Sequence, residues 1–310
     1  MKKGILFIAL GLFAYTMVSC DPVNGGDDPE TTKNYWERSA LTQLQLRGPV
    51  KTIKEFSTDT TYNLTTFDEI GRIVSVEYVG SSDNSSVSYV YNASGQLVSM
   101  GTTTYEYASH GRYVPRGRFH MNTAGLTPNL KAIVSEGVNR TDFVFVVDTL
   151  FIISTGPYHA DTTKVVYSGK YPVSFRTEEF YETGNSWGQF MTVSYQENGM
   201  FDEYSEGSFG TGENPYTDTR TTKYLVDDEF MLVDTYVTNY SGYESYSYTQ
   251  QFTYNQQKDL LTKTEGEYIE EYSNYVYDTH NNWTSRNYRD KNGETWSDLS
   301  EERREITYWE

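Results

Sequence analysis

A short phrase that recurs along the chain restricts its fold more than any other feature. It reads aromatic residue, Asp or Asn, two variable residues, Gly, a polar residue and then apolar residues. Copies begin at Phe67, Tyr91, Tyr254 and Tyr277, and fainter copies between them begin at Tyr107 and Tyr195. Spacings of roughly 20 to 25 residues are typical of folds built from repeated supersecondary units.

The phrase predicts a hairpin turn. The Asp or Asn side chain accepts hydrogen bonds from the turn, and the residue three positions later needs the left-handed conformation that Gly adopts freely and Asn tolerates. This is the three-residue hairpin loop with a glycine bulge. At Lys258 that conformation costs about 1 kcal/mol, so we expect a different loop there. The predicted turn residues are Asp68, Gly71, Asn92, Gly95, Gly111, Gly199, Asn255, Asp278 and Asn281.

The composition favours strands, because the chain has 29 Tyr and only 8 Pro. A tyrosine ring covers the neighbouring strand while its hydroxyl stays in water. Alternating polar and aromatic residues, as in 243–249, leave little apolar surface to hide on either face. A two-layer sandwich is the alternative. We predict an all-β fold, an antiparallel meander of β-hairpin repeats that forms an extended or curled, largely single-layered sheet of about fourteen to eighteen strands.

Three segments depart from the repeats. Residues 142–153 are the most hydrophobic segment after the N-terminal region and lack strict alternation, so we expect burial on both faces and a packed core there. Residues 35–46 favour a short helix. Residues 115–140 favour a long loop or a boundary within the β-repeat domain, which we predict to span 35–310.

The N-terminal region predicts export. Two lysines precede an apolar run over 5–18 that is short for a membrane span, which is typical of a signal peptide over 1–19. Residues 17–20 (Met-Val-Ser-Cys) resemble the lipobox of bacterial lipoproteins, which implies lipidation of Cys20, the only cysteine in the chain. An ordinary signal with an incidental cysteine is the alternative. Residues 20–34 then form a flexible acidic tether.

Two further resemblances concern the envelope. Asp27-Asp28 in the tether resembles the acidic export signals of Bacteroidota-type lipoproteins, which implies an outer-membrane lipoprotein exposed at the cell surface, with the periplasmic face as the alternative. The repeated phrase resembles the YD repeat of Rhs-type proteins, clearly over about 64–100 and 250–290. That family implies β-hairpin spirals and no activity. The ending 277–286 is similar to small lipoproteins of gut Bacteroidota.

The charge balance excludes some partners. The net charge is −18, and it becomes −20 once Lys2 and Lys3 leave with the signal peptide. So acidic a surface argues against nucleic acid as a partner. The expected partners are the membrane, through the lipid anchor, and a glycan or a host protein; the sequence leaves the oligomeric state open.

No motif in the sequence indicates a cofactor or a metal, because His110, His120, His159 and His280 lack zinc-site spacing. Exposed aromatics could stack on sugar rings, although cross-strand packing is the commoner role. These residues are Trp187, Trp283, Trp296, Tyr243, Tyr246 and Tyr248. We therefore predict a non-catalytic binding or structural module. The alternative is a glycosidase-like hydrolase whose carboxylates come from Glu178-Glu179, Glu270-Glu271 or Glu301-Glu302.

Overall fold

The computed structural model describes residues 40–80, 84–115, 126–135, 139–156, 159–180, 186–197, 199–211, 216–226, 232–241 and 244–310. The described residues form one four-residue helix, α1 (Ala40–Gln43), and otherwise strands and turns, so the all-β prediction is confirmed. The strands are β1 (Val50–Phe56), β2 (Tyr62–Phe67), β3 (Ile73–Val79), β4 (Ser85–Tyr91), β5 (Leu97–Met100), β6 (Thr103–Tyr107), β7 (Tyr113–Pro115), β8 (Leu126–Pro128), β9 (Leu130–Ser135), β10 (Asn139–Val146), β11 (Thr149–Gly156), β12 (His159–Ser168), β13 (Tyr171–Phe180), β14 (Ser186–Tyr195), β15 (Phe201–Gly210), β16 (Tyr216–Val226), β17 (Leu232–Ser241), β18 (Glu244–Tyr254), β19 (Leu260–Glu265), β20 (Tyr268–Tyr277), β21 (Trp283–Asn292), β22 (Thr295–Trp296) and β23 (Ser300–Tyr308).

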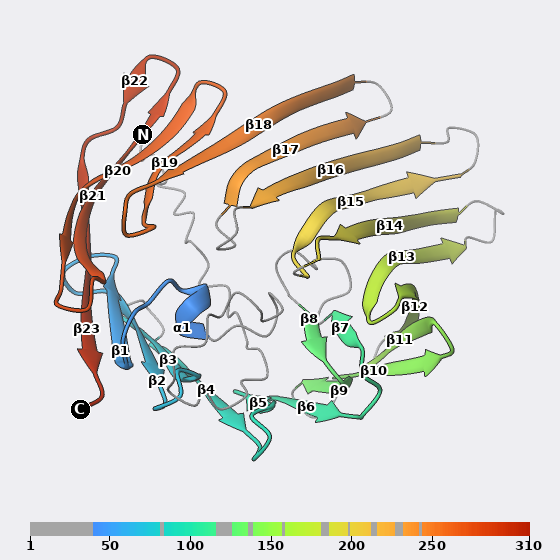
Figure 1. Cartoon of the computed structure of the whole chain (residues 1–310). Coiled ribbons are helices and arrows are strands. Elements are labelled where there is room, and N and C mark those ends of the chain that lie inside the picture. Colours follow the sequence, from blue (N-terminus) through green and yellow to red (C-terminus); the bar gives the residue numbers. More distant parts are fainter. Residues whose placement is uncertain are drawn as a thin grey trace.

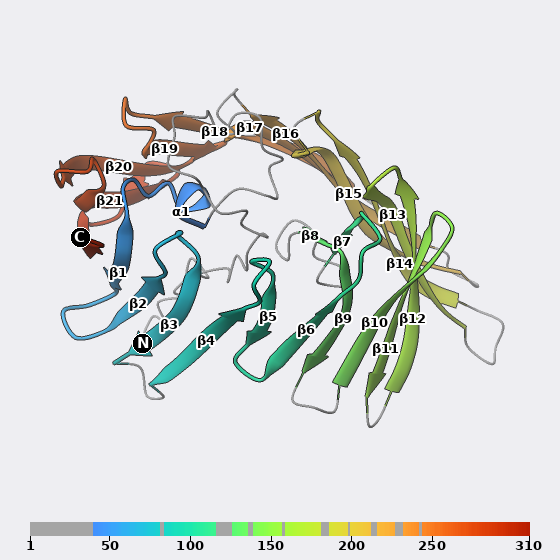
Figure 2. The ribbon, with the colours of Figure 1, turned by 60° about the horizontal axis from the view of Figure 1, so that its bottom comes forward.

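The main sheet closes on itself. β1 pairs with β2 on one side and with the last strand, β23, on the other, and every pairing around the ring is antiparallel. The sheet has 21 strands, of which β22 pairs only with β21, so 20 strands form the ring (Figures 1 and 2). The predicted extended or curled open sheet is therefore wrong. Closure removes the two unpaired edges that an open sheet of this length would expose.

The two faces of the ring differ in chemistry. Residues in direct register share a face, and the row Val193, Tyr204, Thr222, Val237 and Tyr248 runs across five neighbouring strands. The first four of these are buried. α1 lies within the ring in Figures 1 and 2, and its Ala40 belongs to the same buried cluster as Val193 and Tyr204. We call this side the inner face.

The repeated phrase marks one end of the ring. Because strand direction alternates, the turns that follow β2, β4, β14, β18 and β20 all lie at this end, which we call the turn end. In each turn the fourth residue donates its N–H to the carbonyl of the first, at 2.9–3.2 Å. The fourth residues all have positive φ: Gly71 81°, Gly95 77°, Gly199 87°, Lys258 65° and Asn281 60°. The different loop expected at Lys258 is therefore wrong.

Tyrosine hydroxyls join neighbouring hairpins at the turn end. The tyrosine that ends one strand donates to a carbonyl at the start of the strand before it, at 2.7–2.8 Å in four places. These donors and acceptors are Tyr91 and Ile73, Tyr107 and Leu97, Tyr195 and Pro172, and Tyr254 and Leu232. Each hydroxyl thus satisfies a carbonyl outside the strand ladder, which explains why the phrase begins with tyrosine.

The hydrophobic segment 142–153 is not buried on both faces. Phe143, Leu150 and Ile152 point inward and are buried, whereas Val144 and Val146 are 42% and 55% exposed on the outer face. The predicted helix over 35–46 is a single turn, Ala40–Gln43, and residues 35–39 lie outside the described part. Within 115–140, β9 is an ordinary wall strand that pairs with β6 and β10.

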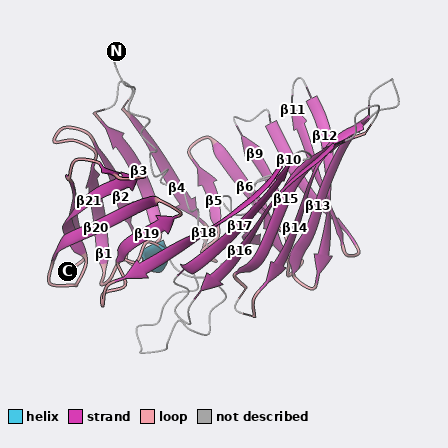
Figure 3. Ribbon diagram, turned by 90° about the horizontal axis from the view of Figure 1, so that it is seen from above, coloured by secondary structure: helices cyan, strands magenta, loops and turns pink. Residues whose placement is uncertain are grey.

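Figure 3 shows the ring of strands from above. Its outer face mixes apolar residues, such as the exposed Val90, Val166 and Leu225, with polar ones. Along β18 its outward residues are Ser245, Ser247, Thr249, Gln251 and Thr253, all of them exposed. Cross-strand ion pairs cover other parts of it: Lys54 with Glu305 at 3.7 Å, Lys223 with Glu203 at 3.2 Å, and Arg289 with Glu271 at 2.7 Å. Charged side chains on the lipid side of a membrane barrel cost about 2–4 kcal/mol each near the midplane. These polar and charged positions would therefore be costly in lipid.

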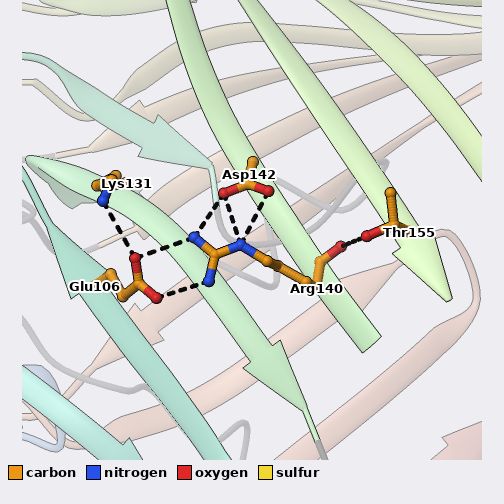
Figure 4. A network of polar contacts seen from close by, with 5 residues as sticks. All are labelled: Glu106, Lys131, Arg140, Asp142 and Thr155. Atoms are coloured by element: carbon orange, nitrogen blue, oxygen red, sulfur yellow. Dashed lines mark hydrogen bonds and ion pairs between the residues drawn. The ribbon is translucent and has the colours of Figure 1, made fainter. Parts of the chain in front are cut away.

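A larger outer-face network lies on β6, β9 and β10 (Figure 4). Arg140 contacts both carboxylate oxygens of Glu106 at 2.7 and 3.0 Å and also binds Asp142, while Lys131 reaches Glu106 at 3.3 Å. The hydrogen bond from Arg140 is the largest of the effects that lower the pKa of Glu106 to about 2. The network holds three strands together through one guanidinium.

Glu106→Gln is expected to lower the free energy of unfolding at pH 7 by less than about 1 kcal/mol, because the group is solvent-exposed. A carboxyl whose folded-state pKa is depressed stabilises the fold above its unfolded pKa and loses that effect as pH falls toward about 2. Urea unfolding at pH 7, 4 and 2.5 (roughly spanning that window) should show the difference from wild type shrinking with acid. Glu77→Gln, on the outer face of β3, is the control. A difference independent of pH would contradict the assignment.

Candidate functional site

A hollow of about 460 Å³ lies along the wall from β14 to β18. Its volume falls in the range of small-molecule sites, about 300–1,000 Å³. Eight of its twelve lining residues form two inner-face rows, and Phe190, Gly207, Thr219 and Tyr240 alternate with them along the strands. One row is Met191, Glu206, Arg220, Asn239 and Tyr246, and the shorter row beside it is Gln189, Ser208 and Asp218. Carboxylates, a guanidinium, amides and an aromatic ring therefore face the same space.

Two charged groups of the hollow, Glu206 and Arg220, each make a hydrogen bond to a tyrosine hydroxyl. Glu206 accepts a hydrogen bond from the Tyr204 hydroxyl at 2.7 Å. Burial, and then the Glu206 carboxylate, raise the pKa of Tyr204, so this hydroxyl stays a donor. Arg220 stands directly opposite Glu206, yet its hydrogen bond is a 3.4 Å contact from Nη2 to the Tyr248 hydroxyl. The hollow thus presents a carboxylate and a guanidinium side by side.

Close backbone approach makes the floor of the hollow rigid. At Gly207 a Cβ atom would lie 2.0 Å from the Asp218 carbonyl oxygen and 2.7 Å from Cζ of Phe190. The Phe190 ring, on the outer face, covers this glycine from the neighbouring strand. Only glycine fits there, and the aromatic neighbour replaces the packing that glycine lacks.

A second group of charges lies where β1 meets β23. Glu55 is in register with Arg304, and Arg286 is in register with Glu302, all on the inner face. Arg304 is 6% exposed, donates Nε to the Trp283 carbonyl at 2.5 Å, and places its guanidinium 3.7 Å from the Trp283 ring centre. Burial raises the pKa of Glu55 and lowers that of Arg304 to about 10. The opposite charges of these residues stabilise one another across β1, β23 and β21. We therefore infer that the cluster helps to hold the ring closed.

The aromatic residues predicted to stack on sugars do not share one surface. Tyr246 and Tyr248 lie on the inner face with rings 6.5 Å apart, and Trp187 shares that face on β14. Trp283 lies at the turn end beneath Arg304. Trp296 is on β22, under Arg289, and Tyr243 lies outside the described residues, as do Cys20 and the 1–34 signal and tether. Of these residues, Tyr246 lines the hollow.

The predicted turn residues gather at the turn end, with one exception. Gly111 has φ 70° and donates its N–H to the side-chain oxygen of Asn129 at 2.7 Å, in the connection that leads to β7 rather than in a hairpin of the wall. His280, in the last turn, stacks on Tyr308 at 3.9 Å. These residues build the fold and leave the hollow to other positions.

Both predicted functions need correction. The hydrolase alternative is wrong, because neighbouring residues on a strand point to opposite faces. Glu270 and Glu302 face inward to Lys263 and Arg286, while Glu271 and Glu301 face outward to Arg289 and Ser285. The side chains of Glu178 and Glu179 lie outside the described part. The predicted binding or structural module on an exposed sheet is also wrong, because the sheet is a closed barrel with an enclosed face.

Sequence reasoning missed the residues that line the hollow. Glu206, Asp218 and Arg220 sit in polar strands without any motif, and only the strand register brings them together. In the part of the chain that the structure describes, no three His, Cys, Asp or Glu residues are placed to hold a metal ion. Among those same residues, no helix has the length and apolar character of a membrane span.

The geometry defines the class of this protein: a closed, 20-stranded antiparallel β-barrel with a polar hollow on its inner face. No protein-family model matches the chain, and no curated protein does either. Two solved structures resemble it distantly. A porin-like protein from Bacteroides uniformis has 10% identity, a TM-score of 0.33, and coverage of 84% of this chain and 98% of its own. A porin-like protein from Bacteroides vulgatus has 10% identity, a TM-score of 0.25 and the same coverage. Superpositions this loose transfer neither topology nor function.

Proposed function

We propose that the chain is a transport protein of the bacterial outer membrane, a closed barrel that carries a small polar solute in its interior. The observation that supports this most is the hollow on the inner face, where Glu206, Asp218 and Arg220 converge from two strands of the closed wall. An enclosed space lined by hydrogen-bonding groups suits a soluble cargo.

The residues of the outer face determine whether the barrel could be embedded in lipid. This face exposes valines, a leucine and tyrosines, but the polar residues along β18 and the cross-strand ion pairs would be costly in lipid. Attachment through a lipid on Cys20, implied by the lipobox resemblance, would hold the barrel beside the bilayer, and the segment after Cys20 would act as a tether. The protein is therefore proposed as a tethered carrier, in contrast to a pore whose wall is embedded in lipid.

Cysteine accessibility tests this function. Ser208→Cys places a thiol on the inner face, and Ser247→Cys places a matched thiol on the outer face. In membrane-bound protein, a small cationic thiosulfonate should label both, whereas a bulky polyethylene-glycol maleimide should label only Ser247→Cys. In a Cys20→Ala background the protein should leave the membrane fraction.

Two outcomes of the labelling experiment would contradict different parts of the proposal. A folded Ser208→Cys protein that the small reagent does not label would have no accessible interior, and the transport proposal would fall. Protection of Ser247→Cys in membranes, together with solute flux through proteoliposomes, would replace the carrier with an embedded pore.

A further inference from the structure

The charges of the hollow are balanced within the protein. Glu206 on β15 stands directly opposite Arg220 on β16, and Asp218, which shares their face, makes its own contacts within the chain. An anion at Arg220 would lie beside the Glu206 carboxylate, and a cation at Glu206 would lie beside the guanidinium. An ion of either sign would therefore gain one attraction and suffer one repulsion. The pair favours a ligand without net charge.

Both charged groups keep capacity for a ligand. The hydrogen bond from the Tyr204 hydroxyl occupies one of about four acceptor positions on the Glu206 carboxylate. The 3.4 Å contact with the Tyr248 hydroxyl involves one nitrogen of the Arg220 guanidinium, Nη2. A ligand hydroxyl both donates and accepts. One hydroxyl, or two on adjacent carbon atoms, can therefore donate to the carboxylate and accept from the guanidinium.

Tyr246 supplies a flat apolar surface next to these polar groups. It is 64% exposed, and the Tyr248 ring on the same strand lies 6.5 Å away and nearly parallel to it, at 15°. The residue opposite Tyr246 is Asn239, and β19 pairs with β18 only from Gln250 onward. Among the described strands, cross-strand aromatic packing therefore does not use this ring. Its negative face suits the C–H groups on the face of a sugar ring.

The length of the row indicates the size of the ligand. Glu206, Arg220, Asn239 and Tyr246 stand in register on four neighbouring strands. Neighbouring strands lie about 4.8 Å apart, so the row spans about 14 Å. This is longer than one hexopyranose ring and suits two linked rings. The volume of about 460 Å³ accommodates a ligand of that size.

We propose that the hollow binds a neutral disaccharide: Tyr246 stacks on one ring, and Glu206 and Arg220 hold the hydroxyls of the other. Asn239, between Arg220 and Tyr246 in the row, binds hydroxyls near the linkage. This inference rests on the proposed transport function and names its cargo.

Calorimetry with four neutral disaccharides tests the assignment. The probes are cellobiose, lactose, maltose and sucrose, and at least one should bind the purified protein. Its component hexoses should bind about tenfold or more weakly, because each reaches only one end of the row. The disaccharide that binds most tightly is then compared with two charged forms of itself, one with a 6-carboxylate and one with a 2-ammonium group. Each charged form should bind about tenfold more weakly.

Two variants should change this discrimination in opposite directions. Arg220→Gln should weaken the neutral disaccharide by about tenfold, the value of one charge-assisted hydrogen bond. It should also narrow the gap to the ammonium form, because Glu206 then lacks its counter-charge. Glu206→Gln should weaken the neutral disaccharide similarly and narrow the gap to the carboxylate form. A purely structural effect would weaken all three forms alike and would contradict the inference.

Stacking has its own pair of variants. Tyr246→Ser should weaken binding about fivefold or more, whereas Tyr246→Phe keeps the ring and should retain it. Tyr236→Ser is the matched control, because Tyr236 is also an exposed tyrosine, on the adjoining strand β17, but lies on the outer face. Its affinity should equal that of the wild type.

Three outcomes would overturn the inference: no binding of any of the four disaccharides, equal binding of a charged form and the neutral form, or equal effects of Tyr236→Ser and Tyr246→Ser. These failures are separable from failure of the transport function, since labelling of Ser208→Cys does not depend on a sugar. A protein that is labelled at this thiol but binds none of the disaccharides would keep the transport proposal and lose this cargo.

Discussion

Replacing Asn282 with alanine is expected to lower the free energy of unfolding by about 3–5 kcal/mol, the cost of leaving several buried polar groups unpaired. Asn282 is fully buried. Its side-chain oxygen accepts the N–H of Arg47 at 2.8 Å, and its amide donates to the Arg47 carbonyl at 2.7 Å and contacts the Tyr308 hydroxyl at 2.8 Å. One side chain therefore connects the segment before β1, the last turn and the last strand.

The measurement is urea unfolding combined with hydrogen exchange of β1 and β23. Exchange of these two strands should rise more than that of β14 to β16, because the ring would open where its ends meet. Asn287→Ala, on the outer face of β21, is the control and should change stability by less than about 0.5 kcal/mol. Unaltered exchange of β1 and β23 in the Asn282→Ala protein would show that the ring is closed by other contacts.

Arg304→Met is expected to destabilise the protein by about 1–3 kcal/mol, because it leaves the half-buried Glu55 carboxylate without the cation that stands opposite it. It also removes the contact with the Trp283 ring. Burial already raises the pKa of Glu55, and the loss of Arg304 would raise it further. A carboxyl with a raised folded-state pKa favours the fold most when protonated, so the deficit should shrink as pH falls toward about 4.

Two variants accompany this measurement. Arg303→Met changes the neighbouring residue, which faces outward and lies 4.2 Å from the Phe56 ring, and it should cost less than about 1 kcal/mol. The double variant Glu55→Gln with Arg304→Met should recover part of the lost stability, since no carboxylate is then stranded. An Arg304→Met protein as stable as wild type at pH 7 would contradict the pairing of Glu55 with Arg304.

The turns were predictable because their causes are local. Asp68 Oδ1 accepts the N–H groups of Ile70 and Arg72, and Asp278 Oδ1 accepts those of His280 and Asn282, so the phrase encodes its own hydrogen bonds. Two turn predictions were wrong: the copy of the phrase at Tyr107 leads to β7 and closes no hairpin of the wall, and Lys258 adopts the turn that we expected it to avoid. The sheet around that turn outweighs a left-handed cost of about 1 kcal/mol.

Closure and the hollow were not predictable from the same residues. The pairing of Ile53 with Ile306 joins positions at opposite ends of the chain, and no local pattern reports such a contact. Alternation in 142–153 was hidden because apolar residues occupy both faces, Val144 outward and Phe143 inward. Arg220 lies in a threonine-rich strand without a motif. Its neighbours in the hollow, Glu206 and Asn239, are set by the register of the adjacent strands.

The tyrosine hydroxyls of the turn end have a consequence for how such a barrel can change in size. Each one joins a hairpin only to the hairpin before it, so Tyr91 depends on Ile73 and Tyr254 depends on Leu232. Duplication or deletion of one whole hairpin would leave every other such bond in place and would alter the circumference by two strands. The width of the interior can therefore evolve by the number of hairpins, while the side chains that line the hollow evolve separately.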